Sequence, residues 1–553
     1  MSRMIKSLKL AGATAIFLAA ASPALARIHV SWPPVRLHAP WAHRTLDKPV
    51  RTDAGRVSGT AGAVSGVRVF KGIPFAAAPV GELRWKAPQP VTPWKGVRAA
   101  DKYGKVCMQQ PGKGRVNPAT DMPDSPGMSE DCLYLNVWTA AKGAGEKRPV
   151  MVWLYGGAYT EGGGSAPFSE GNQLAEKGVV LVTLNYRNGA FGFLSHPELT
   201  AESGRNASGN YALMDSIAAL QWVKANIAAF GGDPDNVTVF GESAGACMAA
   251  ALVGSPVAKG LLKRAISESG AWMGLGIAKM MPLATAEAMT VKQAEALGAK
   301  SLADLRAMSA EDVLNKLRGQ GMIVDGWIVP EDLSTTFAEG RQNPIDVLVG
   351  SNGDEGSFGA AFGPPMTAQA WREGAARRWG SLADKGLAAY PAATDEEAKA
   401  VAVAPFADAM AWHMRLYADD QAKIGQKAWV YLFAHQPLYD PGKPNLAAAH
   451  TAEIPYVFDD LAAPRTFPGQ SSVTLMSGNP KEEAFADQVS SYWVNFARTG
   501  DPNGPGLPEW PRVNDLAATQ TMVLDDPSGR GPGLTQAKVD LYDAMYARDV
   551  GAR

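Results

Sequence analysis

Short apolar runs alternate with amphipathic stretches through the middle of the chain. Residues 179–184 are mostly β-branched and lie between Gly178 and Asn185, which suits a strand buried on both faces. Apolar residues then recur every three or four positions over 211–230, as in a helix. Residues 237–240 read as the next strand, with a helix directly after them. The alternation predicts an α/β fold whose mostly parallel sheet carries helices on both faces.

Other segments extend this pattern toward both ends of the chain. Residues 282–317 and 367–420 read as helical blocks, and a long helix over 482–498 is expected to close the domain. Because the sequence contains no internal repeat and no Gly/Ser/Pro-rich linker, we expect these blocks to be insertions into one domain. Further short strands are predicted at 55–59, 67–70, 133–138, 149–154, 346–350 and 428–433.

The first 26 residues resemble a removable export signal. Arg3, Lys6 and Lys9 precede an apolar run over 10–21, and Ala24-Leu25-Ala26 provides an A-x-A cleavage pattern. We therefore predict a signal peptide over 1–26, cleaved after Ala26, and a periplasmic or secreted domain over 27–553. No other stretch reaches the roughly 20 apolar residues that a bilayer requires, so stable membrane insertion is not expected.

Composition and charge narrow the function classes. The chain has 553 residues, of which 46% are hydrophobic, as is ordinary for a globular protein. Lys plus Arg number 53 and Asp plus Glu 54, giving a net charge of −1. This balance gives no electrostatic support for binding nucleic acid. The sequence predicts no particular oligomeric state.

Three cysteines become informative once export is assumed. In an oxidising compartment one pair is expected to bridge and one cysteine to remain free. Closing the Pro/Gly-rich loop between Cys107 and Cys132 would stabilise the fold by about 3 kcal/mol. Cys247 lies in an apolar helical run and is expected to be a buried free thiol. No Cys/His spacing is typical of a zinc site.

The segment Gly241-Glu242-Ser243-Ala244-Gly245 matches G-x-S-x-G at the junction of a predicted strand and a predicted helix. In this context the motif indicates a nucleophile elbow, a tight strand-to-helix turn that presents the serine hydroxyl above the sheet. The helix that follows directs free N–H groups and the positive end of its dipole toward the reacting oxygen. Ser243 is therefore the candidate nucleophile.

Three histidines follow Ser243 and are candidates for the general base, because the triad order on such a fold is Ser, acid, His. His413 lies in a helical run and His435 ends a strand, whereas His450 lies in a loop. Catalytic residues favour loops that a rigid scaffold positions. We therefore predict His450 as the base.

The acid and the oxyanion donors are expected at the ends of two other strands. Asp354 and Glu355 follow the strand over 347–350, and spacing does not choose between them. The strand beginning at Met151 ends in Gly156-Gly157-Ala158, where backbone amides can approach a substrate closely. The glycines at 162–164 are expected to make the adjoining loop pliable.

Together these features resemble the type-B carboxylesterase/cholinesterase family of α/β-hydrolases. The resemblance covers nearly all of the chain after the signal peptide. The blocks that carry it lie at 70–76, 83–85, 129–137, 155–158, 185–187, 232–234, 241–245 and 354–356, and at His450.

The resemblance implies roles that spacing leaves open. Glu355 becomes the catalytic acid, and the amides of Gly157, Ala158 and Ala244 become the oxyanion donors. Ala158 stands where the family more often has a third glycine, but it keeps the N–H group. Ser269 is expected behind the triad.

The same resemblance pairs Cys107 with Cys132. Glu242, next to the nucleophile, is expected to support the triad together with Ser269. No metal or organic cofactor is implied.

The function that follows is a secreted serine carboxylesterase acting on a small-molecule ester. Two alternatives are a catalytically inactive adhesion module on the same fold and a serine peptidase. Trp371-Arg372 and Arg377-Arg378-Trp379 lie in a helical block that matches the family poorly. If Arg377 and Arg378 face the gorge mouth, they would favour bulky carboxylated esters, such as fumonisin-type mycotoxins.

Overall fold

The computed structural model describes residues 46, 48–110, 117, 119–121, 125–271, 273–275, 279–357, 366–464 and 471–551. The predicted signal peptide over 1–26 lies outside the described residues. The division into a signal peptide and one domain over 27–553 therefore stays a prediction.

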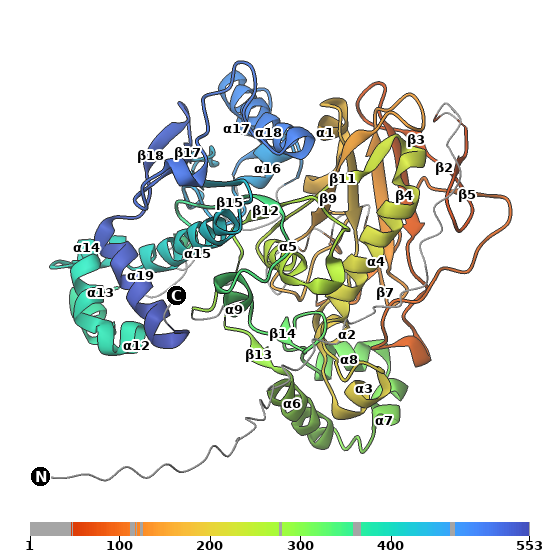
Figure 1. The fold of residues 1–553 in the computed structure, drawn as a ribbon, viewed down its shortest axis with the longest axis horizontal. Helices are drawn as coiled ribbons and strands as arrows, with labels where there is room; N and C mark the ends of the chain where they lie inside the picture. The colour runs from red at the N-terminus through yellow and green to blue at the C-terminus, as the bar shows by residue number, and fades with distance from the viewer. Residues whose placement is uncertain are drawn as a thin grey trace, which may run out of the picture. The chain divides into compact units, whose positions relative to one another are not determined.

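An eleven-stranded sheet runs through the described part of the chain (Figure 1). Its order is β18-β17-β16-β15-β12-β11-β9-β10-β8-β4-β3. The strands from β10 to β17 in this order pair in parallel, whereas β8, β4, β3 and β18 pair antiparallel to their neighbours. The strands are β3 Thr60–Ala61, β4 Arg68–Pro74, β8 Tyr134–Thr139, β9 Arg148–Leu154, β10 Val180–Leu184, β11 Gly232–Glu242, β12 Arg264–Glu268, β15 Asp346–Asn352, β16 Ala428–Phe433, β17 Gln520–Leu524 and β18 Gly529–Pro532.

The parallel strands form because their sequences are apolar on both faces. Every residue of β10 and of β12 is buried, as is typical of a strand covered on both sides. Their β-branched residues suit a fully covered pleated surface. This confirms the predicted mostly parallel sheet. Among the described residues, three smaller sheets lie outside it, formed by β1 Val50–Arg51, β2 Arg56–Ser58 and β5 Val97–Ala99, by β6 Val106–Cys107 and β7 Met128–Ser129, and by β13 Met281–Pro282 and β14 Ile323–Val324.

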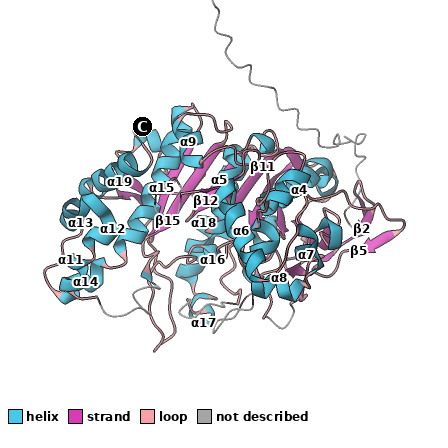
Figure 2. Ribbon diagram, turned by 90° about the horizontal axis from the view of Figure 1, so that it is seen from below, coloured by secondary structure: helices cyan, strands magenta, loops and turns pink. Residues whose placement is uncertain are grey.

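Helices flank this sheet (Figures 1 and 2). Helix α5 packs along β11 and β12, α15 packs along β15 and β16, and α18 packs against β9 and β11. The helices are α1 Asn172–Glu176, α2 Gly189–Phe193, α3 Pro197–Glu202, α4 Tyr211–Asn226, α5 Ala244–Gly254, α6 Leu283–Ala296, α7 Leu302–Ala307, α8 Ala310–Lys316, α9 Leu333–Ala338, α11 Ala368–Glu373, α12 Ala375–Trp379, α13 Ala383–Ala389, α14 Asp395–Val401, α15 Ala404–Lys423, α16 Ile454–Val457, α17 Val473–Met476, α18 Pro480–Thr499 and α19 Gln536–Asp549.

Two sequence predictions need correction. Strand β11 begins at Gly232, earlier than predicted, because Gly232 pairs with Arg148 of β9 across an irregularity in the register. Helix α18 occupies the predicted place but does not close the domain. The chain continues into β17, which adds a parallel strand beside β16, and into the helix α19.

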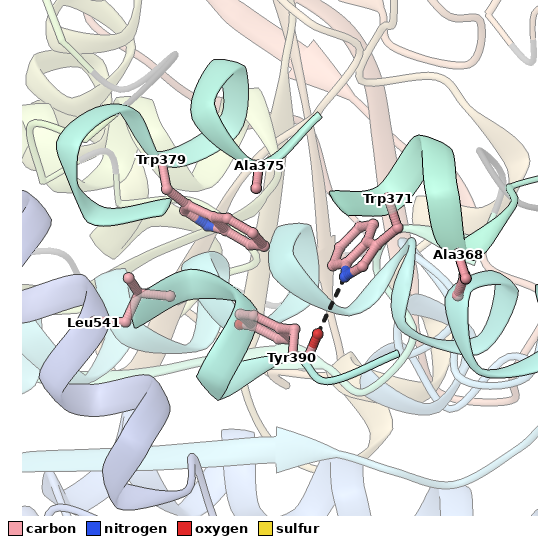
Figure 3. Close-up of a cluster of buried hydrophobic side chains, with 7 residues drawn as sticks. Ala368, Trp371, Ala375, Trp379, Tyr390 and Leu541 are labelled. Carbon is pink, nitrogen blue, oxygen red and sulfur yellow. Dashed lines mark hydrogen bonds between the residues drawn. The ribbon is translucent and has the colours of Figure 1, made fainter. Parts of the chain in front are cut away.

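Helices α11 to α14 form a lobe with its own apolar core, which is completed by α19 (Figures 1 and 3). Trp371 and Trp379 meet edge to face, and Tyr390 stacks on Trp379. The indole of Trp371 donates a hydrogen bond of 3.1 Å to the Tyr390 carbonyl, and Leu541 of α19 is fully buried against the cluster. The Arg378 guanidinium lies 4.0 Å from the centre of the Trp371 ring.

Two further features of the described residues concern linkage and membranes. Cys107 and Cys132 form a disulfide with Cα atoms 4.9 Å apart, and Cys247 is a buried free thiol, as predicted. No helix in the described ranges combines the length and the apolar character needed to cross a bilayer.

Candidate active site

The predicted site residues follow the carboxyl ends of neighbouring parallel strands. Gly157 and Ala158 follow β9, Ser243 follows β11, Glu355 follows β15, and His450 lies in the segment after β16. Loops at this edge of a parallel sheet converge, which is why such folds place their ligands there. The topology therefore accounts for bringing these distant segments together.

Ser243 occupies a strained turn between β11 and α5. Its backbone has φ 54° and ψ −119°, a conformation that non-glycine residues rarely adopt. The turn is possible because Gly241 and Gly245 carry no side chain. A Cβ on Gly245 would lie 1.9 Å from the carbonyl oxygen of Leu154, and one on Gly241 would lie 2.5 Å from the same oxygen. The G-x-S-x-G pattern is thus a packing requirement of β9 against α5.

The turn leaves Ser243 accessible within an otherwise buried segment. Every residue of α5 is buried, whereas Ser243 is partly exposed. The Ser243 amide donates a 2.8 Å hydrogen bond to the Glu268 carbonyl, which fixes the elbow to the end of β12. The hydroxyl therefore lies at the N-terminus of α5, where the helix dipole favours negative charge.

Glu355 and His450 are in direct contact. The Glu355 carboxylate oxygen Oε2 lies 2.5 Å from Nδ1 of His450. Glu355 is buried, whereas a quarter of the His450 side chain, 26%, is exposed. A buried carboxylate on Nδ1 orients the imidazole and stabilises its charged form.

Asp354, the alternative acid in the sequence, has a different position. Its backbone amide donates to the Ala448 carbonyl at 2.9 Å, and its carboxylate accepts from the Ala448 amide at 3.1 Å. These bonds join the loop of Glu355 to the loop of His450. Asp354 therefore ties the two loops, and Glu355 is the residue that meets the imidazole.

The candidate oxyanion donors lie on a run of left-handed backbone. Gly157, Ala158 and Tyr159 have φ values of 110°, 52° and 64°. Successive N–H groups in such a turn can form a concavity suited to an anion. Within the described residues, no group accepts a hydrogen bond from the amides of Gly157, Ala158 or Ala244. All three remain available to a substrate oxygen.

Tyr159, which the sequence analysis did not single out, anchors this strained run. Its carbonyl accepts a 2.7 Å hydrogen bond from the Gly189 amide, and its ring centre lies 5.1 Å from that of Phe193. Its hydroxyl interacts electrostatically with the thiol of Cys247 on α5. Tyr159 therefore links the segment of Gly157 and Ala158 to the helix that carries Ala244.

Glu242 faces the other side of the imidazole. Its Oε1 lies 3.1 Å from Nε2 of His450, so the ring is held between two carboxylates. Burial lowers the pKa of His450, but the charges of Glu242 and Glu355 outweigh this and raise that pKa to about 10. Burial raises the pKa of Glu242 to about 8. In this structure Nε2 of His450 therefore faces Glu242.

Four carboxyl residues at and around this contact are buried, namely Glu242, Glu268, Glu355 and Glu453. In the part of the chain that the structure describes, none of them pairs with a lysine or an arginine. Burial raises the pKa of Glu453 to about 7 and that of Glu268 well above its ordinary value. No sequence pattern pointed to Glu268, whereas Glu453 follows His450 closely enough to have been considered.

Ser269 lies behind the elbow, as the family resemblance implied. It follows β12 with φ 57°, is buried, and donates its amide to the Gly350 carbonyl at 2.8 Å. Its hydroxyl has no hydrogen-bond partner among the described residues. Ser269 therefore lies at the ends of β12 and β15, between the elbow and the loop of the acid.

The other two candidate histidines, His413 and His435, do not belong to this group of side chains. Nδ1 of His413 accepts a hydrogen bond from the Met273 amide, and burial lowers the His413 pKa to about 4. His435 lies between Glu482 and Asp525. Neither histidine contacts Glu355, which agrees with the choice of His450.

Comparison with known proteins identifies the class. The model of the carboxylesterase family matches residues 47–541. The chain therefore belongs to the carboxylesterase family, whose members hydrolyse carboxylic esters on an α/β-hydrolase fold.

Individual relatives are similar over most of their length. A fumonisin B1 esterase of Sphingopyxis macrogoltabida is 36% identical over 90% of this chain and 91% of the relative. A para-nitrobenzyl esterase of Bacillus subtilis is 35% identical over 86% of this chain and 94% of the relative. The solved structure of a Geobacillus stearothermophilus carboxylesterase superposes with a TM-score of 0.73 and 33% identity, over 89% of this chain and 99% of that structure.

Proposed function

We propose that this chain is an exported serine carboxylesterase that works through Ser243, His450 and Glu355. The observation that carries the proposal is the contact of 2.5 Å between Glu355 and His450 beside the strained elbow of Ser243. A serine at such a turn, a histidine and a buried carboxylate are the parts needed to activate a hydroxyl for nucleophilic attack.

The reaction follows from this arrangement. The imidazole of His450 turns Nε2 toward Ser243 and accepts its proton as Oγ attacks the ester carbonyl. The amides of Gly157, Ala158 and Ala244 donate hydrogen bonds to the oxyanion that develops. His450 then protonates the leaving alcohol. Water attacks the acyl-enzyme, with His450 again as base, and releases the acid.

Replacing the nucleophile tests this proposal. Ser243→Ala should reduce kcat for a short acyl ester by about 10⁴-fold or more, because no covalent step remains. A fluorophosphonate probe should label the wild type and not the variant. Ser255→Ala, at the opposite end of α5 where the side chain caps a short turn, serves as the matched control and should keep full activity. Unchanged hydrolysis by Ser243→Ala would overturn the assignment.

The two alternatives give different outcomes in the same assays. An inactive adhesion module would be labelled by no fluorophosphonate probe. A serine peptidase would cleave the amide version of a substrate at a rate comparable with that of the ester. We expect labelling and a strong preference for the ester.

For the substrate, we propose a bulky ester whose acyl group carries carboxylates. The support is the similarity to a relative named fumonisin B1 esterase, 36% identical over 523 residues. The measurement is kcat/KM for a matched pair of esters, one with a neutral acyl group and one with a terminal carboxylate. Preference for the neutral ester would contradict this substrate class.

The arginines suggested by the sequence do not add support. Arg378 makes its contacts with Trp371 and Trp379 inside the helical lobe, where its guanidinium stacks on both indole rings. We therefore expect Arg378→Ala to weaken the lobe and to leave the preference between the two esters unchanged. Arg377→Ala provides the exposed neighbour for comparison.

Export is proposed from the first 26 residues alone. Sequencing the N-terminus of protein recovered from outside the cytoplasm should give Arg27 as the first residue. A mature protein that still begins at Met1 would contradict the cleavage.

A further inference from the structure

The segments that supply Glu355 and His450 come from two different strands and must be held together. Apart from the bonds of Asp354 described above, one side chain spans them. Asn352, the last residue of β15, is fully buried. Its Nδ2 donates a 2.7 Å hydrogen bond to the carbonyl of Ala449, the residue before His450. Its side chain therefore reaches across from the acid's strand to the loop of the histidine.

The same amide group also holds one of the buried carboxyls. Nδ2 of Asn352 donates a second, short hydrogen bond to Oε2 of Glu453. Glu453 is fully buried, and its other oxygen has no hydrogen-bond partner among the described residues. The backbone amide of Asn352 donates to Oε1 of Glu355 at 2.9 Å. Asn352 thus contacts the acid, the histidine loop and the carboxylate beneath them.

The charge of Glu453 matters because several ionisable groups crowd this space. The groups that interact electrostatically with one another or with Glu453 are Glu242 on β11, Glu268 on β12, Tyr431 on β16, Glu355 and His450.

Adjacent buried carboxyls cannot all be charged, so each donor helps to decide which of them is ionised. The Asn352 amide favours ionised Glu453, and ionised Glu453 favours the charged imidazole of His450.

We propose that Asn352 is a positioning residue for the esterase reaction: its side-chain amide holds the loop of the acid against the loop of His450 and favours ionised Glu453 beneath them. The inference rests on the proposed function and deepens it. Asn352 touches no substrate. It acts through Glu355, Glu453 and the His450 loop.

The first test is Asn352→Ala, followed by kcat and kcat/KM from pH 5 to pH 10. Removing the hydrogen bonds of the Asn352 side chain should lower kcat by about tenfold or more, since small displacements of catalytic groups reduce the rate strongly. Glu453 would also lose its donor and become neutral more readily. His450 would then lose a proton more easily, so the acid limb of kcat/KM should move to lower pH by about one unit.

Asn352→Asp gives an outcome that a purely structural residue would not produce. The new carboxyl would share one proton with Glu453, which preserves that hydrogen bond and the single negative charge, but it offers no second donor to the Ala449 carbonyl. At higher pH the pair would lose that proton, and two adjacent carboxylates would repel. We expect kcat at low pH to lie between the values for the wild type and Asn352→Ala, with a new fall in kcat/KM on the alkaline side.

Glu453→Gln separates the two parts of the role. The amide oxygen that this substitution introduces can still accept a hydrogen bond from Asn352, so kcat should be largely kept, while the acid limb moves to lower pH.

The matched control is Asn136→Ala on β8, another buried asparagine whose amide ties neighbouring segments together. It should reduce stability without moving the pH profile.

Active sites are counted in each preparation by fluorophosphonate labelling, so that rates refer to folded enzyme. If Asn352→Ala does not fold, the alkaline limb of the kcat/KM profile of Asn352→Asp tests the inference instead. Wild-type pH profiles and rates for both Asn352 variants would overturn this inference and leave the esterase intact. An unlabelled wild type, or an active Ser243→Ala, would instead overturn the proposed function.

Discussion

At the scale of single residues, the position of His450 between two carboxylates determines how activity should depend on pH. Its pKa is raised to about 10, so the neutral base becomes available only as the pH rises through that region. Glu242 lies on the Nε2 side, where the serine proton would arrive in the proposed reaction. The resting site therefore favours the protonated imidazole, and catalysis has to overcome this preference.

We predict that kcat/KM rises with pH and that its acid limb lies above about 6.5, the ordinary histidine value. Glu242→Gln removes one of the two charges that stabilise the imidazolium, so the limb should move to lower pH by about one unit. The measurement is the pH profile of kcat/KM for a short acyl ester. Glu396→Gln, on the exposed surface of α14, is the charge-matched control. A limb that does not move in Glu242→Gln would contradict this account.

The interaction between Tyr159 and Cys247 affects the candidate oxyanion donors rather than the base. Tyr159→Phe keeps the ring but removes the hydroxyl, which should loosen the position of Gly157 and Ala158 relative to α5. Because oxyanion donors act mainly in the transition state, kcat should fall by about fivefold with little change in KM.

Cys247→Ala should have the same effect as Tyr159→Phe, and the double variant should lose no more than either single one. Additive losses would show that the two side chains act separately.

Candidate site residues could be predicted from sequence where their local context carries the signal. Ser243 lies in a motif between two recognisable elements, and His450 is the one of the three histidines after Ser243 that the sequence places in a loop. The choice between Asp354 and Glu355 required the family resemblance, because adjacent acids in a turn point in different directions. Asn352 could not be identified from sequence because its contacts with Ala449 and Glu453 arise only when two loops, distant in the chain, lie side by side.

At the scale of elements, the elbow is held by the packing of α5 against β9. A Cβ on Gly245 would lie 1.9 Å from a backbone oxygen of β9, and neither backbone can withdraw without separating the strand from the helix. Gly254, at the other end of α5, faces the tip of the Leu333 side chain instead, 2.6 Å from an added Cβ. That side chain can rotate away.

Gly245→Ala should therefore abolish activity or folding, with a loss in kcat/KM of about 100-fold or more, because a displacement of this size misplaces Ser243. Gly254→Ala should keep most of the activity. Yield of soluble protein, thermal unfolding and fluorophosphonate labelling distinguish the two variants. Equal tolerance of both substitutions would mean that the close approach of β9 does not constrain the elbow.

The central elements could be predicted from sequence because their periodicity is strong, as in β10 and α4. The C-terminal elements could not. Strand β17 is short and lies among proline- and glycine-rich segments, and its place in the sheet depends on pairing with β16 far earlier in the chain. The helical character of the block over 367–420 was correctly predicted, but periodicity did not indicate that α19 would complete its core.

At the scale of the whole molecule, the buried carboxyls couple stability to pH. The pKa values of Glu242 and Glu453 are raised to about 8 and about 7, so the folded protein binds more protons than the unfolded chain between about pH 4.5 and pH 8. The raised pKa of His450 acts in the same direction from about pH 6.5 to pH 10. These groups should therefore make the folded state less stable as the pH rises.

Glu453→Gln tests this dependence of folding stability on pH. Because glutamine stays neutral, the variant should gain stability relative to the wild type between pH 5 and pH 9, by about 2 kcal/mol. The free energy of unfolding from denaturant titrations at both pH values gives the comparison. A difference between variant and wild type that is the same at the two pH values would contradict the assignment of raised pKa to Glu453.

The completion of the helical lobe by α19 has a consequence for how the protein is made. Leu541 fills the lobe's core, Tyr542 shares a 2.9 Å hydrogen bond with Tyr390, and the guanidinium of Arg548 donates to the Trp379 carbonyl at 2.6 Å. The ribosome adds each of these residues long after the tryptophans of the lobe. Those tryptophans therefore stay uncovered while the intervening chain is synthesised, and the nascent protein cannot close this part of the fold until α19 has emerged.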